Sequence, residues 1–173
     1  MRQYQTSLKY GFYGALLGIV FFMLLLFSGN SPWGSASWMG SWIPAISAYF
    51  AIKTYKAEAE ETSFSFSQLF RISVFTLFFQ AIIVNVLSVI LSTILQINSL
   101  ELYRAEMLQY AEQIKQLVSE EIYNEAMVEL QNATYSTLAF QDFTNKLIGG
   151  LIVSLILAGI FRKNKPTFEN QHE

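Results

Sequence analysis

The stretch SLELYRAEMLQYAEQIKQLVSEEIYNEAMVELQNATYSTLAFQDFTNK, residues 99–146, is the one sizeable part of this chain that is not suited to lipid. It holds eight of the thirteen acidic residues, against three basic ones. The runs before and after it, residues 72–100 and 147–161, are apolar, and residues 147–161 carry no charge. An acidic, helix-forming segment between apolar runs indicates an insert that a membrane frame holds on one side of a bilayer.

Composition and the distribution of charge predict the frame. The chain is 53% hydrophobic and 14% charged, whereas soluble domains are about 25% charged. A further charge-free run covers residues 11–52. Because a bilayer core about 30 Å thick needs about 20 helical residues, that run predicts two spans and the other runs one each. We expect an all-α integral membrane protein with four transmembrane helices, at about residues 8–27, 35–52, 69–97 and 143–161.

The insert has the pattern of two amphipathic helices. Its first half repeats apolar residues at spacings of three and four, and its second half does the same after Ser119. The seam residues are Leu100, Tyr103, Met107, Tyr110, Ile114 and Leu117, then Tyr123, Met127 and Leu130. The pattern predicts a helical hairpin over residues 99–142, with Ser99 as its first N-cap. Residues 1–98 would then hold three spans, and residues 162–173 a tail.

Three glutamates follow one another at four-residue intervals on the second predicted helix: Glu121, Glu125 and Glu129. Like charges at this spacing repel each other, so they suit open solvent, a bound cation or a basic partner. Because no calcium-loop pattern accompanies them, a solvated face is favoured over a cation site. They stay candidates for a partner surface.

Basic residues indicate the orientation. The N-terminus, the 53–71 loop and the tail hold eight Lys and Arg residues, and the insert holds three. Because Lys and Arg accumulate on the cytoplasmic side, we expect both termini to be cytoplasmic and the hairpin to be extracytoplasmic.

Two sets of residues predict contacts between the spans. Asn85, Ser88, Ser92 and Gln96 share one face of the third span, which must turn inward from lipid. That face suits either a polar pathway or, as we favour, interhelical hydrogen bonds. Small residues form two further stripes, which predict close helix packing with each other, within one chain or between copies. The stripes are Gly14 and Gly18 in the first span, and Gly150, Ser154 and Ala158 in the fourth.

The connection between the first two spans is uncharged and aromatic. Trp33, Trp38 and Trp42 suit the interface between lipid and water, where an indole ring is in apolar surroundings and its N–H is wet. Pro44 predicts a kink near Gly40 to Pro44 in the second span, because proline lacks a backbone donor and clashes with the preceding turn.

Several chemistries have no residues to support them. The chain has no cysteine, its single histidine is His172 in the tail, and no ionisable residue lies deep in a span. We therefore expect no enzyme, no metal site and no cofactor. A net charge of −2 without a basic stripe argues against a nucleic-acid partner.

Five segments resemble the bacterial membrane family called domain of unknown function 4199. They are AIKTYK at 51–56, FSQLF at 66–70, Glu106-Met107, Glu125-Ala126-Met127, and IFRK at 160–163. The resemblance covers nearly the whole chain. It implies a four-span inner-membrane protein of Gram-negative bacteria, and it carries over no catalytic residue.

Two function classes stay open. We favour a non-catalytic scaffold or accessory subunit in the lipid bilayer, whose outer hairpin contacts another envelope protein. The alternative is a small transporter or channel subunit that uses the polar face of the third span, and four spans would then require a homo-oligomer.

Overall fold

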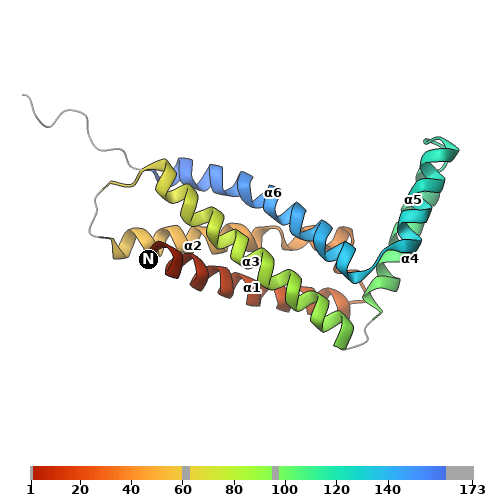
Figure 1. Cartoon of the computed structure of the whole chain (residues 1–173), viewed down its shortest axis with the longest axis horizontal. Coiled ribbons are helices and arrows are strands. Elements are labelled where there is room, and N and C mark those ends of the chain that lie inside the picture. Colours follow the sequence, from red (N-terminus) through yellow and green to blue (C-terminus); the bar gives the residue numbers. More distant parts are fainter. Residues whose placement is uncertain (1, 60–62, 95–97, 163–173) are drawn as a thin grey trace, which may run out of the picture. The chain divides into compact units, whose positions relative to one another are not determined.

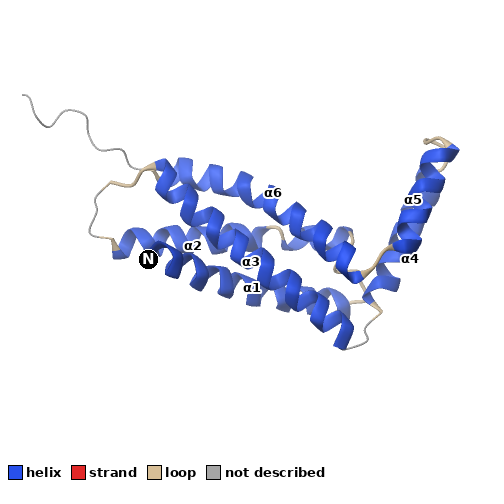
Figure 2. Cartoon of the chain, in the orientation of Figure 1, coloured by secondary structure: helices blue, strands red, loops and turns tan. Residues whose placement is uncertain are grey.

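The computed structural model describes residues 2–59, 63–94 and 98–162. These residues form six α-helices and one 3-10 helix, and they contain no strand (Figure 2). The all-helical prediction is confirmed. In chain order the elements are α1 (Arg2–Phe27), η1 (Ser35–Gly40), α2 (Trp42–Glu58), α3 (Phe66–Ile94), α4 (Ser99–Ile114), α5 (Glu120–Asn132) and α6 (Tyr135–Phe161) (Figure 1).

Three of the helices, α1, α3 and α6, are long and apolar enough to cross a membrane. They have 26, 29 and 27 residues. The expectation of a membrane protein is thus confirmed for the described residues at the level of length and composition. The segment predicted as the second span, residues 35–52, is divided between η1 and α2, and α2 has 17 residues.

The kink predicted near Gly40 to Pro44 takes the form of a break between η1 and α2. η1 ends at Gly40, and α2 starts afresh at Trp42. Pro44 therefore lies in the first turn of α2, where its missing N–H removes no intrahelical hydrogen bond. The connection begins with Gly29 at φ +77°, whose N–H donates to Leu26 O at 3.0 Å. This left-handed residue ends α1.

The helix boundaries around the insert also differ from the prediction. α6 begins at Tyr135 rather than near Phe143. Thr134 and Thr137 explain the earlier start, because each hydroxyl accepts the backbone N–H of the other, at 3.2 and 2.8 Å. Reciprocal bonds of this kind satisfy two N–H groups that a helix start leaves unpaired. Gln96 lies outside the described residues.

Ser99 does not cap α4 as predicted. The N-cap is Asn98, which makes no side-chain capping bond, and Ser99 lies inside the helix. Its buried hydroxyl donates to Ser92 Oγ at 3.3 Å. The serine therefore joins the start of α4 to the end of α3.

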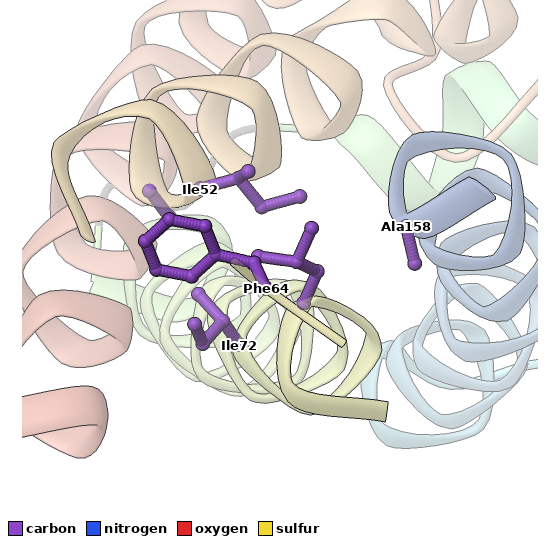
Figure 3. Close-up of a cluster of buried hydrophobic side chains, with 6 residues drawn as sticks. Ile52, Phe64, Ile72 and Ala158 are labelled. Carbon is purple, nitrogen blue, oxygen red and sulfur yellow. The ribbon is translucent and has the colours of Figure 1, made fainter. Parts of the chain in front are cut away.

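The chain divides into two compact units, which are described separately. The first consists of Met1–Gly14, Ile43–Ala81 and Lys146–Glu173. Its apolar core draws side chains from α2, the connection before α3, α3 and α6 (Figure 3). The buried core residues are Ala51, Ile52, Phe64, Leu69, Ile72 and Ala158. Lys56 borders this core and donates to Phe161 O at 2.9 Å, so that α2 caps the C-terminus of α6.

The second unit consists of Ala15–Trp42 and Ile82–Asn145. It contains the end of α1, η1, the end of α3, the beginning of α6, and the helices α4 and α5, which pack against each other. Ser119 caps α5 by accepting the N–H of Ile122 at 3.3 Å.

Candidate functional site

The predicted polar face of α3 is buried. Asn85, Ser88 and Ser92 are 6%, 1% and 1% exposed, and Gln80, one turn earlier, is 5% exposed. The helix therefore turns its amides and hydroxyls inward, where neighbouring side chains replace lipid. Gln96, the fourth predicted member, lies outside the described residues. Whether this face forms a pathway stays a prediction.

In the first unit, α1 packs closely on α3 through small residues. A Cβ built on Gly11 would lie 2.8 Å from Thr76 O, a backbone atom of α3. One turn earlier, Ser7 Oγ donates to Ile72 O at 3.0 Å. One turn later, a Cβ on Gly14 would collide with Ser47 Oγ of α2 and would lie 2.6 Å from Gln80 Oε1 of α3. Gly14 thus makes room for two polar side chains from two other helices.

The stripe on α6 packs on α3 as well. Gly150, Ser154 and Ala158 are all buried, and a Cβ on Gly150 would lie 3.3 Å from Leu77 Cβ. In the second unit, Gly18 faces Val84 of α3, at 2.9 Å from its built Cβ. The prediction that the two stripes are counterparts of each other is therefore wrong. Gly14, Gly18 and Gly150 each lie close to side chains of α3 instead.

Some buried oxygens have no partner among the described residues. They are Ser73 Oγ, Gln80 Oε1, Ser88 Oγ and Ser154 Oγ. A buried polar atom without a hydrogen bond is costly, by about 1–3 kcal/mol. None of these groups ionises at neutral pH, so they can bind a polar guest or each other but cannot exchange protons as acids or bases.

A different site links the insert to the connection between α1 and α2. Glu106 Oε1 of α4 accepts the Ser35 backbone N–H at 2.8 Å and the Ser35 hydroxyl at 2.6 Å. Tyr110 OH donates to the same hydroxyl oxygen at 3.3 Å. The carboxylate lies against Gly34, where a Cβ would collide with it. We call this group of contacts the Glu106 latch.

The α4–α5 pair is held by polar contacts. Arg104 donates to the carbonyl oxygens of Gln131 and Ala133, at 3.1 and 3.0 Å, and so ties α4 to the C-terminal end of α5. At the opposite end, Tyr123 OH donates to Glu112 Oε1 at 2.7 Å. Lys115 Nζ lies 5.0 Å from the centre of the Tyr123 ring. Ser99 is the one buried residue in the two helices.

Two tyrosines of the pair have pKa values above their ordinary range. Burial raises the pKa of the Tyr103 phenol, and the negative charges of Glu106 and Glu129 raise it further. The pKa of Tyr123 is raised mainly by its hydrogen bond to Glu112. Both phenols therefore stay neutral donors well into the alkaline range.

The three predicted glutamates lie on the solvent side of α5. Glu121, Glu125 and Glu129 are exposed, and Ile122 and Val128, both 56% exposed, lie among them. We call these five residues the outer face of α5. No group of three potential metal ligands occurs in the described part of the chain. The outer face of α5 is thus a mixed acidic and apolar surface.

Sequence reasoning missed the residues that join α4 to α5 and to the connection between α1 and α2. Glu106 and Ser35 are 71 positions apart, and an isolated glutamate on an amphipathic helix gives no signal for such a contact. Arg104 lies 3.5 Å from Glu101 on its own helix, a local contact that sequence spacing can suggest, but its bonds to the two carbonyls required the packing of α4 on α5. Ser47 lies in a span whose pattern is uniformly apolar, and only the contact with Gly14 identifies it.

Comparison with known proteins gives one match. No curated protein and no solved structure matches the chain. The profile of the family described as "Protein of unknown function (DUF4199)" matches residues 9–163, which include all of α2 to α6 and the part of α1 from Lys9 onward. The chain therefore belongs to the DUF4199 family, as its sequence segments indicated.

Proposed function

We propose that this protein is a four-span, non-catalytic scaffold or accessory subunit of the bacterial inner membrane. Its termini are cytoplasmic, and its α4–α5 pair forms an outer hairpin that contacts another envelope protein. The outer face of α5 is the observation that carries the proposal.

The contacts of α2 support four spans. Arg2 at the start of α1 lies 3.6 Å from Glu58 at the end of α2, so the two helices run antiparallel. Lys56 meets the C-terminal end of α6 at the same end of the first unit. At a rise of about 1.5 Å per residue, the 17 residues of α2 extend about 25 Å, which is close to the bilayer core.

The Glu106 latch supports an outer position for the hairpin. It joins α4 to the connection between α1 and α2. If α1 crosses the membrane from a cytoplasmic N-terminus, that connection is outside, and so is α4. The Lys and Arg residues on the opposite loops agree with this orientation.

The chemistry of the buried residues supports a non-catalytic role. The buried polar side chains of the described residues are hydroxyls and amides, which are poor acids, bases and metal ligands at neutral pH. Exposed Ile122 and Val128 provide apolar contact area for a partner, and the three glutamates of the same face favour a partner with basic residues.

The test is purification in mild detergent from native membranes, followed by mass spectrometry. We expect a partner in stoichiometric amount, which is lost when Glu121, Glu125 and Glu129 are all replaced by Gln. The matched control adds the same charge to α4 and the turn after it, with Gln109→Lys, Gln113→Lys and Gln116→Lys, and should keep the partner. A protein that purifies without a partner, or with one that survives the glutamine variant, contradicts the proposal.

A second candidate function is a small transporter or channel subunit. The unpartnered buried oxygens Gln80 Oε1 and Ser88 Oγ favour it, because a polar guest would satisfy them. In that case Asn85→Ala, Ser88→Ala and Ser92→Ala together should abolish flux in reconstituted vesicles. The same variant should leave an accessory role intact.

A further inference from the structure

The 3-10 helix η1 exposes large apolar side chains at the outer end of the second unit. Trp38 and Met39 are 74% and 61% exposed, and Trp42, just after η1, is 52% exposed. Trp33 differs, because its ring packs edge-on against Phe22 at a centroid distance of 5.4 Å. Two of the three tryptophans thus face outward, and the third belongs to the interior of the unit.

The element that carries these side chains has little to hold it. η1 has six residues and no buried one, and Gly34 before it makes no side-chain capping bond. An isolated turn of this length is unstable in water. Its first backbone N–H, that of Ser35, is bound by Glu106 from α4, as is the Ser35 hydroxyl.

We propose that η1 and Trp42 form an anchor in the interfacial layer of the outer leaflet, and that Glu106 holds this anchor in its orientation. Glu106 is then a positioning residue, which fixes the outer hairpin to the surface of the bilayer. This inference rests on the four-span topology proposed above.

Lipid is the occupant that the surroundings favour. Phe27 at the end of α1 is also exposed, at 78%, and α1 is one of the helices suited to cross the membrane. Residues 28–41 contain no charged residue that would oppose insertion. Exposed indoles next to a membrane span prefer the interface between the hydrocarbon and the head groups.

Tryptophan fluorescence in phosphatidylcholine vesicles tests the anchor. Three variants of the full chain each keep one tryptophan and carry Phe at the other two positions. Lipids brominated near the head-group end of the acyl chain should quench Trp38 and Trp42 more than lipids brominated near the chain end. Trp33 should be quenched less by both. Equal quenching of all three tryptophans by bromolipid would overturn the proposal. So would Trp38 and Trp42 that are shielded from aqueous iodide but not quenched by bromolipid, and that result would favour a protein partner as the occupant.

Hydrogen exchange tests the latch without depending on the anchor. Glu106→Ala should accelerate exchange in peptides covering residues 33–40 by about tenfold or more, since it removes charge-assisted bonds to Ser35. It should also reduce the shallow-lipid quenching of Trp38. Glu106→Gln keeps an acceptor oxygen and should restore most of both signals. The matched control is Glu112→Ala on the same helix, which should change neither, and unchanged far-UV circular dichroism shows that each variant folds.

The outcomes separate this inference from the topology on which it rests. Unchanged exchange in Glu106→Ala would overturn the latch even if the four spans are correct. Bromolipid can also be placed in one leaflet only. If Trp38 and Trp42 were quenched only by bromolipid in the cytoplasmic leaflet, the four-span topology itself would be wrong.

Discussion

Two regions of the molecule are held together in opposite ways. Where α1 meets α3, glycines let the helices approach until a Cβ on Gly11 would lie 2.8 Å from a backbone oxygen. Where α4 meets α5, contact depends on side chains that reach across, such as Arg104 to Ala133 O and Tyr123 to Glu112. The first contact is buried and the second is largely exposed.

The difference follows from the solvents that the two regions suit. Lipid gives no hydrophobic driving force between helices, so close packing of small residues and internal hydrogen bonds must hold them together. A helix pair in water is stabilised by burying an apolar seam between the helices. Two helices of only 16 and 13 residues bury little apolar surface in this way. We therefore expect α1 and α3 to form a rigid frame, and α4 and α5 to be a surface that a partner can stabilise.

The largest expected effect is at Gly14. Gly14→Ala places a methyl group against Ser47 and Gln80, so we expect a loss of about 1–3 kcal/mol of unfolding free energy. The matched control is Gly149→Ala on α6, where a Cβ would meet nothing within 4 Å. Thermal unfolding in detergent measures both. Equal effects of the two substitutions would contradict the packing of α1 described above.

Removing Arg104 should loosen the outer pair without affecting the frame. Arg104→Met leaves the Gln131 and Ala133 carbonyls without their charged donor, at an expected cost of about 1–2 kcal/mol because the group is partly exposed. Hydrogen exchange should accelerate in α5 and stay unchanged in α1 and α3. Gln113→Met is the control, since Gln113 is an exposed residue of the same helix. Faster exchange in all helices would show that the two regions do not differ.

Replacing the central glutamate of α5 should stabilise that helix slightly, whereas the loss of Arg104 destabilises it by a larger amount. Glu125→Gln removes two like-charge pairs, with Glu121 and Glu129, each worth about 0.2–0.5 kcal/mol. Exchange in α5 should slow slightly in the isolated protein, while binding of the proposed partner weakens. An α5 that loses protection in this variant would show that the glutamates have structural roles.

The smallest effect concerns Tyr103, whose pKa is raised by burial and by Glu106 and Glu129. The folded state therefore keeps this proton longer than the unfolded chain, whose tyrosines titrate near pH 10. The contribution of Tyr103 to stability is present below that pH and declines as the pH rises through the folded-state value. Ultraviolet absorbance of the phenolate measures the titration. Glu129→Gln should lower the pKa of Tyr103, and Glu121→Gln should leave it unchanged.

The sequence was sufficient for features that depend on periodicity and composition. The charge-free runs predicted α1, α3 and α6, and the spacing of Ser88 and Ser92 predicted the buried face of α3. Features that depend on contacts between distant segments were not predictable. Pattern alone could not tell that the Gly14 stripe meets α3 rather than α6, because several helices are equally apolar.

The outer end shows the same limit. In the sequence, Glu106 is one of several acidic residues of the insert. Its hydrogen bond to Ser35 depends on where α4 begins. The pattern placed Ser99 as the N-cap of α4, whereas Ser99 lies inside the helix and its hydroxyl donates to Ser92 Oγ at 3.3 Å. Helix ends depend on such single bonds, so the early start of α6 at Tyr135 was missed as well.

The most direct test of the four-span account is the accessibility of single cysteines, since the chain has none of its own. Asn30→Cys, before η1, and Glu125→Cys, on α5, should both react with a membrane-impermeant maleimide added to spheroplasts. Gln5→Cys and Ser67→Cys, at the starts of α1 and α3, should react only after the membrane is permeabilised. Labelling of Asn30→Cys and Glu125→Cys from opposite sides would show that α2 does not cross, and would contradict the account.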